Sequence, residues 1–85
     1  MQELKYVIND ALGLHARPAG LLAKLAAKHK SDIQIGTPVK MVNAKRIIGV
    51  MALTIKQGQE MIMTFSGEDE TEAAVAVKAF LEQNL

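Results

Sequence analysis

The sequence contains no cysteine. This absence excludes a disulfide framework, a zinc site built on thiolates and catalysis by a thiol nucleophile. Aromatic residues make up only 4% of the chain, and the formal net charge is +1. Nucleic-acid-binding domains usually combine a strong positive charge with stacking aromatic side chains. A nucleic-acid partner is therefore not expected. The evidence for this alternative is limited to five basic residues: Lys24, Lys28, Lys40, Lys45 and Arg46.

A long hydrophobic run is also missing. The longest, residues 47–55, is interrupted by Gly49 and Thr54. It is much shorter than the roughly 20 apolar residues that span a bilayer. The first five residues, MQELK, lack the basic start and apolar stretch of a signal peptide. We therefore expect a soluble, cytoplasmic protein without direct membrane insertion.

What the chain does contain is the composition of a folded globular protein. Hydrophobic residues account for 49% of the chain and charged residues for 22%, which excludes a disordered chain. No linker, low-complexity tract or internal repeat divides its 85 residues. We expect a single domain over residues 1–85, with one small core.

Hydrophobic periodicity predicts most of the elements. Alternating apolar residues predict a strand over residues 4–8 and further strands near residues 33–35, 39–43 and 60–66. Apolar residues at spacings of three and four predict a helix over residues 16–29. Pro18 is compatible with this helix, because the first helical turn has no internal acceptor for the N–H that proline lacks.

The remaining segments are a short ambiguous stretch and a C-terminal helix. Residues 46–52 fit either a strand or a short helix, and Gly49 weakens both. Asp69 followed by Glu72 resembles a capping box and predicts a helix start. The order of elements predicts an α+β fold with helices on one face of a mainly antiparallel sheet. The predicted buried stripe of the last helix is Ala73, Ala76, Val77 and Phe80, extending toward Leu81 and Leu85.

One segment, residues 13–19 (GLHARPA), has the residues of a functional site. It places His15 immediately before a helix and Arg17 two residues further on. The first turn of a helix offers free N–H groups and a partial positive charge, which bind anions such as phosphate. The same charge favours the neutral imidazole, which is the nucleophilic form. In most proteins, a histidine at a helix start is only a polar cap and a nearby arginine is only solvated. The segment alone therefore fits either a phosphoryl-accepting histidine or an ordinary helix start.

The segment resembles the phosphohistidine motif of the HPr family, the histidine-containing phosphocarriers of the sugar phosphotransferase system. Two further blocks are similar to the same family. The first comprises residues 43–45 (NAK), residues 47–51 (IIGVM) and Leu53, and the second comprises residues 67–70 (GEDE) with the amphipathic helix after them. The spacing between the three blocks also fits, so the resemblance covers essentially the whole chain.

The resemblance implies an open-faced β-sandwich, in which three helices cover one face of a four-stranded antiparallel sheet, with a short helix at residues 46–52. It implies that enzyme I, charged by phosphoenolpyruvate, phosphorylates Nδ1 of His15. The group would then pass to a IIA protein or domain for sugar uptake. Arg17 would assist transfer, and the backbone amides of Ala16 and Arg17 would hold the phosphoryl group. Such a carrier is not a stand-alone enzyme and needs no metal or cofactor.

The resemblance also explains Leu21, an apolar residue on a charged helix face. In the family, exposed apolar residues of the first and short helices dock both partners, and a basic rim suits an acidic partner. A carrier of this size is expected to be a monomer. Burial of Ile47 and Ile48 in the core is the alternative. The predicted partner-binding residues are Gly20, Leu21, Lys24, Lys45, Ile47, Ile48 and Met51, with Arg17 at the rim.

Two positions depart from the family pattern. Arg46 stands where many members carry a regulatory serine, so control by serine phosphorylation is not expected there. Leu12 stands where a small polar residue is common, so we expect a local cap to be missing. A carrier in a regulatory phosphorelay and a non-phosphorylated interaction module are the alternative functions. The second histidine, His29, is interpreted as a cation at a helix end rather than a metal ligand.

Overall fold

The computed structural model describes residues 1–85, which is every residue of the chain. The elements follow the predicted order. They are β1 (Gln2–Val7), α1 (Ala16–Ala27), β2 (Asp32–Thr37), β3 (Lys40–Asn43), α2 (Ile47–Met51), β4 (Glu60–Ser66) and α3 (Glu70–Asn84). None of the helices combines the length and the apolar character required to cross a membrane.

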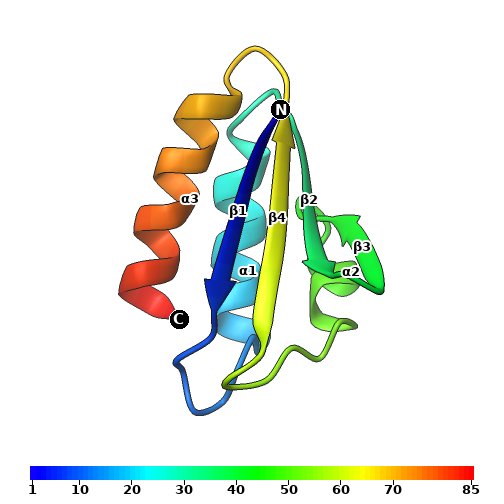
Figure 1. Ribbon diagram of the computed structural model, residues 1–85, viewed down its shortest axis with the longest axis vertical. Helices are drawn as coiled ribbons and strands as arrows, with labels where there is room; N and C mark the ends of the chain where they lie inside the picture. Colours follow the sequence, from blue (N-terminus) through cyan, green and yellow to red (C-terminus); the bar gives the residue numbers. More distant parts are fainter.

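The four strands form one antiparallel sheet in the order β1-β4-β2-β3. β4 is central, pairing with β1 from Gln2–Phe65 to Val7–Glu60 and with β2 on its other side. In Figure 1, α1 lies behind β4, α3 runs beside β1, and α2 lies next to β3. The predicted fold, a four-stranded antiparallel sheet with three helices on one face, is confirmed. The ambiguous residues 47–51 form the short helix.

The core lies between the sheet and the helices. Alternate residues of β4, Met61, Met63 and Phe65, are completely buried, which confirms the predicted period of two. The stripe predicted for α3 is only partly correct. Ala73, Val77, Leu81 and Leu85 are buried, whereas Ala76 and Phe80 are half-buried, and of these two Phe80 packs against the core. The buried residues are spaced by four throughout, so the stripe continues along a single row of the helix.

Gly36 permits a tight hairpin between β2 and β3. Thr37 pairs with Lys40, so only Pro38 and Val39 form the loop, and Val39 is exposed in the turn rather than starting the strand as predicted. A Cβ atom at Gly36 would overlap the Lys40 carbonyl oxygen and lie 2.9 Å from the Cα of Met41. Only glycine fits this close approach of two backbones.

Asp69 does not form the predicted capping box. It is the N-cap residue of α3 but makes no capping hydrogen bond with its side chain. Its carboxylate instead accepts hydrogen bonds from the hydroxyl and N–H of the buried Ser31 and from the N–H of Lys30, at 3.0 Å. The side chain therefore connects the start of α3 to the segment between α1 and β2, about 38 residues earlier in the chain.

These bonds predict a pH-dependent loss of stability. The hydrogen bond from the Ser31 hydroxyl and that from the Lys30 N–H hold the pKa of Asp69 well below its usual range. In the unfolded chain the pKa of an aspartate is about 3.9. The stabilisation is therefore fully present above that pH, and it is lost as the pH falls further toward the lower folded-state pKa.

Urea unfolding between about pH 6 and about pH 2 checks this expectation. Asp69→Asn should be less stable than the wild-type protein at pH 6, and the difference should shrink at low pH. Asp32→Asn is a matched control, because Asp32 is exposed and its carboxylate bonds only to the Gln34 side chain. A wild-type minus Asp69→Asn difference that does not change with pH would contradict the assignment.

Candidate functional site

His15 lies at the N-terminus of α1, as predicted. It is the N-cap residue, with extended backbone angles (φ −106°, ψ −175°), and its carbonyl oxygen accepts the N–H of Ala19 at 2.9 Å. The next two N–H groups, of Ala16 and Arg17, have no acceptor inside the helix. They also donate none of the loop or side-chain hydrogen bonds. The imidazole, 36% exposed, therefore stands beside two free amide donors at the positive end of a helix dipole.

The turn before α1 fixes where His15 is presented. Gly13 has a positive φ of 70°, and a Cβ atom there would lie 2.9 Å from the Cα of Lys56. The adjacent Leu14 is buried and donates its N–H to the Ile55 carbonyl at 2.9 Å. A left-handed glycine and a buried anchor thus attach the residue before His15 to the segment that precedes β4.

Asp10 was not identified as a site residue from the sequence. Its Oδ1 accepts the Leu12 N–H at 2.9 Å, and its Oδ2 lies 3.7 Å from Nε2 of His15. Leu12 offers no capping group, and α1 has no side-chain capping hydrogen bond at its N-cap residue. The Asp10 carboxylate closes the turn before the helix by accepting the Leu12 N–H. An aspartate that hydrogen-bonds the backbone two residues on is a common turn former. The spacing Asp10-x-x-Gly13 was the available signal.

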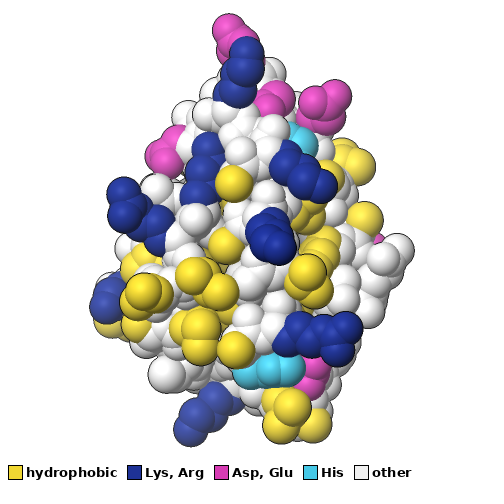
Figure 2. Space-filling view, turned by 180° about the vertical axis from the view of Figure 1, so that it is seen from behind, with side chains coloured by type: hydrophobic (Ala, Val, Ile, Leu, Met, Phe, Trp, Pro, Cys, Tyr) yellow, Lys and Arg dark blue, Asp and Glu magenta, His cyan; other side chains and the backbone are white.

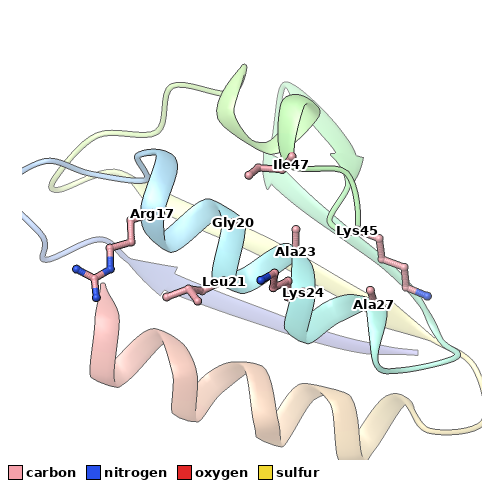
Figure 3. Close-up of a pocket in the computed structure, with 8 residues that line it drawn as sticks. All are labelled: Arg17, Gly20, Leu21, Ala23, Lys24, Ala27, Lys45 and Ile47. Carbon is pink, nitrogen blue, oxygen red and sulfur yellow. The ribbon is translucent and has the colours of Figure 1, made fainter.

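Arg17 lies in the first turn of α1 and forms no ion pair with an acidic side chain. Its guanidinium extends beyond the start of the helix (Figure 3). Arg17 lines the same hollow as the imidazole of His15, so the two residues predicted to act on the phosphoryl group share one cavity. The residues that line this hollow are Asp10, Leu12, His15, Arg17, Pro18, Leu21, Gln83 and Asn84.

A groove between α1 and α2 continues from Arg17. Figure 3 shows Leu21 and Lys24 on α1, with Ile47 at the start of α2 on the other side. Figure 2 shows apolar side chains gathered on one face of the molecule with basic side chains around them. The groove is lined by Arg17, Gly20, Leu21, Ala23, Lys24, Ala27, Lys45 and Ile47. It therefore brings together five of the seven residues predicted to bind partners.

The other two predicted residues, Ile48 and Met51, lie on the exposed side of α2. The exposed fractions are 81% for Ile48, 41% for Ile47, 40% for Met51 and 43% for Leu21. The alternative that Ile47 and Ile48 belong to the core is therefore wrong. Val50 is the α2 residue that enters the core. A five-residue helix that exposes most of its apolar side chains has an unusually apolar surface for its size.

Lys45, which was predicted to bind partners, also forms hydrogen bonds within the protein. Its side chain is half-buried, and Nζ donates a hydrogen bond of 2.8 Å to the carbonyl oxygen of His29. Its N–H also donates to the Asn43 side chain at 2.9 Å. Lys45 thus connects the segment before α2 to the end of α1, and Arg17 and Lys24 are the exposed cations on the α1 side of the groove.

His29 lies at the other end of α1 from His15. Its Nδ1 is 3.4 Å from Oδ2 of Asp69, so it faces a carboxylate rather than acting only on the helix end. Together with Glu72, these residues form the one group of three side chains that could hold a metal ion. The Asp69 oxygens already accept hydrogen bonds from Lys30 and Ser31. The arrangement is therefore explained by packing of α3 against the end of α1.

Comparison with known proteins decides the family. The family model described as the PTS HPr component phosphorylation site matches residues 2–83. The chain belongs to the HPr family. Among relatives, the phosphocarrier protein HPr of Mycoplasma genitalium is 41% identical over 85 residues, covering 99% of this chain and 97% of that protein. The HPr of Lysinibacillus sphaericus is 39% identical over 83 residues, with 98% and 94% coverage.

Solved HPr structures share the fold closely. HPr-C-His from Thermoanaerobacter tengcongensis superposes with a TM-score of 0.92 at 40% identity, covering 98% of this chain and 93% of that one. The Bacillus subtilis protein Crh superposes with a TM-score of 0.77 at 35% identity, covering 100% of this chain and 98% of that one. It was solved as a dimer with a swapped domain. An HPr dimer from T. tengcongensis is also known. Dimeric forms therefore occur among the structural relatives.

Proposed function

We propose that this HPr-family protein is a phosphocarrier that accepts a phosphoryl group on His15 and passes it to a second protein. The observation that supports this most strongly is the position of His15. A partly exposed imidazole stands beside two unused backbone amides at the N-terminus of α1. Helix N-termini with free N–H groups are general sites for phosphate. The donor is enzyme I charged by phosphoenolpyruvate, and the acceptor is a IIA protein or domain of the phosphotransferase system.

The transfer is a substitution at phosphorus. The lone pair on Nδ1 of His15 forms a new N–P bond, while the bond between phosphorus and the donor breaks and its electron pair returns to the donor. Negative charge on the phosphoryl oxygens is met by the N–H groups of Ala16 and Arg17. The Arg17 guanidinium adds a mobile cation that bonds phosphate strongly. The partner then attacks the same phosphorus, and His15 leaves as neutral imidazole.

The apolar groove supplies the contact with both partners. Apolar surface is exposed by Leu21, Ile47, Ile48 and Met51, and Arg17 and Lys24 line the groove. Arg17 and Leu21 also line the hollow that contains His15. An apolar centre with a cationic rim favours fast encounter with an acidic partner. The same small face must bind the donor first and the acceptor afterwards. Neither the complex with the donor nor the complex with the acceptor can therefore be long-lived. A monomeric single domain in the cytoplasm is the simplest form of such a carrier.

Arg46 has no hydroxyl group, so serine phosphorylation cannot control the protein at this position. It is the exposed N-cap residue of α2, and its side chain makes no capping bond. A phosphoserine at a helix start is stabilised by the helix dipole and adds about −1.5 to −2 charge at neutral pH. Arg46 places a permanent positive charge there instead. A role in a regulatory phosphorelay stays compatible with this difference, since His15 and Arg17 are both present.

Intact mass tests the proposal. The purified protein is mixed with enzyme I, magnesium and phosphoenolpyruvate, with a parallel sample that lacks phosphoenolpyruvate. We expect a gain of one phosphoryl group, which acid removes because phosphohistidine is acid-labile, followed by its loss when a IIA protein is added. If no gain occurs with several active enzyme I preparations, the proposal is wrong, and a non-phosphorylated interaction module becomes the better explanation.

A further inference from the structure

Asp10 is held more firmly than a loop residue usually is. Its N–H donates to the Leu85 carbonyl at 2.9 Å, and its own carbonyl oxygen accepts the Gly13 N–H at 2.9 Å. Its Oδ1 accepts the Leu12 N–H at 2.9 Å. Three hydrogen bonds therefore fix both the backbone and the side-chain direction of this residue. Its second carboxylate oxygen, Oδ2, accepts none of the hydrogen bonds found between protein groups.

That second oxygen faces the imidazole. Oδ2 lies 3.7 Å from Nε2 of His15, and the two side chains are 30% and 36% exposed. The separation is longer than a hydrogen bond, but bonds of this kind in resting sites commonly shorten when the reactant arrives. Both residues belong to the hollow that opens at the start of α1. No other carboxylate forms a pair with His15.

We propose that Asp10 is a positioning residue for phosphoryl transfer, which holds the proton of neutral His15 on Nε2 and so presents Nδ1 as the nucleophile. The inference rests on the proposed function. A carboxylate can only accept a hydrogen bond, so it selects the tautomer that carries N–H on the facing nitrogen. The nitrogen on the other side of the ring then keeps its lone pair. In serine proteases an aspartate fixes the tautomer of a histidine in the same way.

The arrangement also suits the charge that develops during transfer. When Nδ1 forms its bond to phosphorus, the donor bond breaks with its electron pair and no proton moves. The Nε2–H stays in place, and the ring becomes a phosphorylated imidazolium. Its positive charge is shared with the Asp10 carboxylate on one side, while the amides of Ala16 and Arg17 bind the phosphoryl group on the other. When the partner takes the phosphoryl group, the ring returns to the same neutral tautomer.

Asp10→Asn separates this role from a structural one. The asparagine oxygen can still accept the Leu12 N–H, so the turn is retained. The amide nitrogen would then face Nε2 as a donor, which favours the opposite tautomer, with the proton on Nδ1. Nitrogen-15 NMR of the imidazole, recorded above the range in which histidine titrates, reads the tautomer without any partner protein. We expect a shift toward the Nδ1–H form in the variant.

The same variant should be phosphorylated by enzyme I about threefold to fivefold more slowly, a loss typical of one partly exposed charge pair. Asp32→Asn, which removes an exposed carboxylate on β2, should leave both tautomer and rate unchanged. Asp10→Ala, which also removes the bond to Leu12, measures the structural contribution. If Asp10→Asn keeps the wild-type tautomer and rate, Asp10 acts only on the turn and the inference is wrong. Because the tautomer is read without enzyme I, a failure of the proposed function would be seen separately.

Discussion

Replacing His15 with alanine should abolish phosphorylation by enzyme I, whereas replacing His29 with alanine should leave it intact. The chain has only these two histidines, and they lie at opposite ends of α1. His15 stands beside free amides and Arg17 in an open hollow. His29 faces Asp69, a carboxylate that would repel an incoming phosphoryl group, and its side chain is only 14% exposed. Intact mass after incubation with phosphoenolpyruvate and enzyme I distinguishes the two variants.

Circular dichroism should accompany this comparison, because His29 packs near the start of α3. We expect both variants to retain the wild-type spectrum, so that a loss of labelling reports the chemistry and not the fold. Labelling that persists in His15→Ala and disappears in His29→Ala would reverse the assignment. Labelling that persists in both would place the phosphoryl group on another side chain.

Replacing Gly36 with alanine should lower the free energy of unfolding by about 2–3 kcal/mol, a typical cost of forcing an extra carbon into a packed position. The added Cβ would overlap the Lys40 carbonyl, which belongs to the backbone and cannot rotate away. The hairpin must open, and β3 would then separate from β2 near the turn, where Gly36 pairs with Met41. Urea denaturation measures the loss, and reduced protection of the β3 amides in hydrogen exchange would locate it.

Gly49 provides the matched control for the same chemical change. A Cβ atom there would meet only Val42, at an ordinary contact distance of 3.8 Å. Because alanine favours the helix over glycine by about 0.5–1 kcal/mol, Gly49→Ala should be neutral or stabilising. Equal effects of the two substitutions would show that the close approach at Gly36 does not constrain the hairpin.

The fold was predictable because local patterns and tertiary packing agree along most of the chain. Alternation identified β4, and spacings of three and four identified α1. In the five-residue α2 the pattern alone did not decide between strand and helix, since a single helical turn and a short strand can bury the same residue. Resemblance to the HPr family resolved this segment as a helix. It left Ile48 open between the surface and the core, and the structure shows that this residue is exposed.

Two residues that sequence analysis misread, Asp69 and Lys45, have partners that are distant in the chain. Asp69 has the spacing of a cap, but its carboxylate binds donors at residues 30 and 31. Lys45 was predicted to bind partners, and its bond to the His29 carbonyl was not foreseen. Asp10 reaches His15 only because Gly13 bends the chain and Leu85 holds the Asp10 backbone. Spacing rules describe neighbours along one element, so they carry no information on contacts between elements such as those of Asp69 and Lys45.

The central position of β4 has a consequence for how the protein is made. Both β1 and β2 pair with β4 and not with each other. While a ribosome has released only the residues before β4, β1 therefore has no partner strand, and β2 has only its hairpin with β3, which is marginal alone in water. The sheet can close only when residues 60–66 emerge. Folding is thus delayed until most of the nascent chain is available. During that interval the apolar faces of β1 and β2 remain exposed and prone to aggregation.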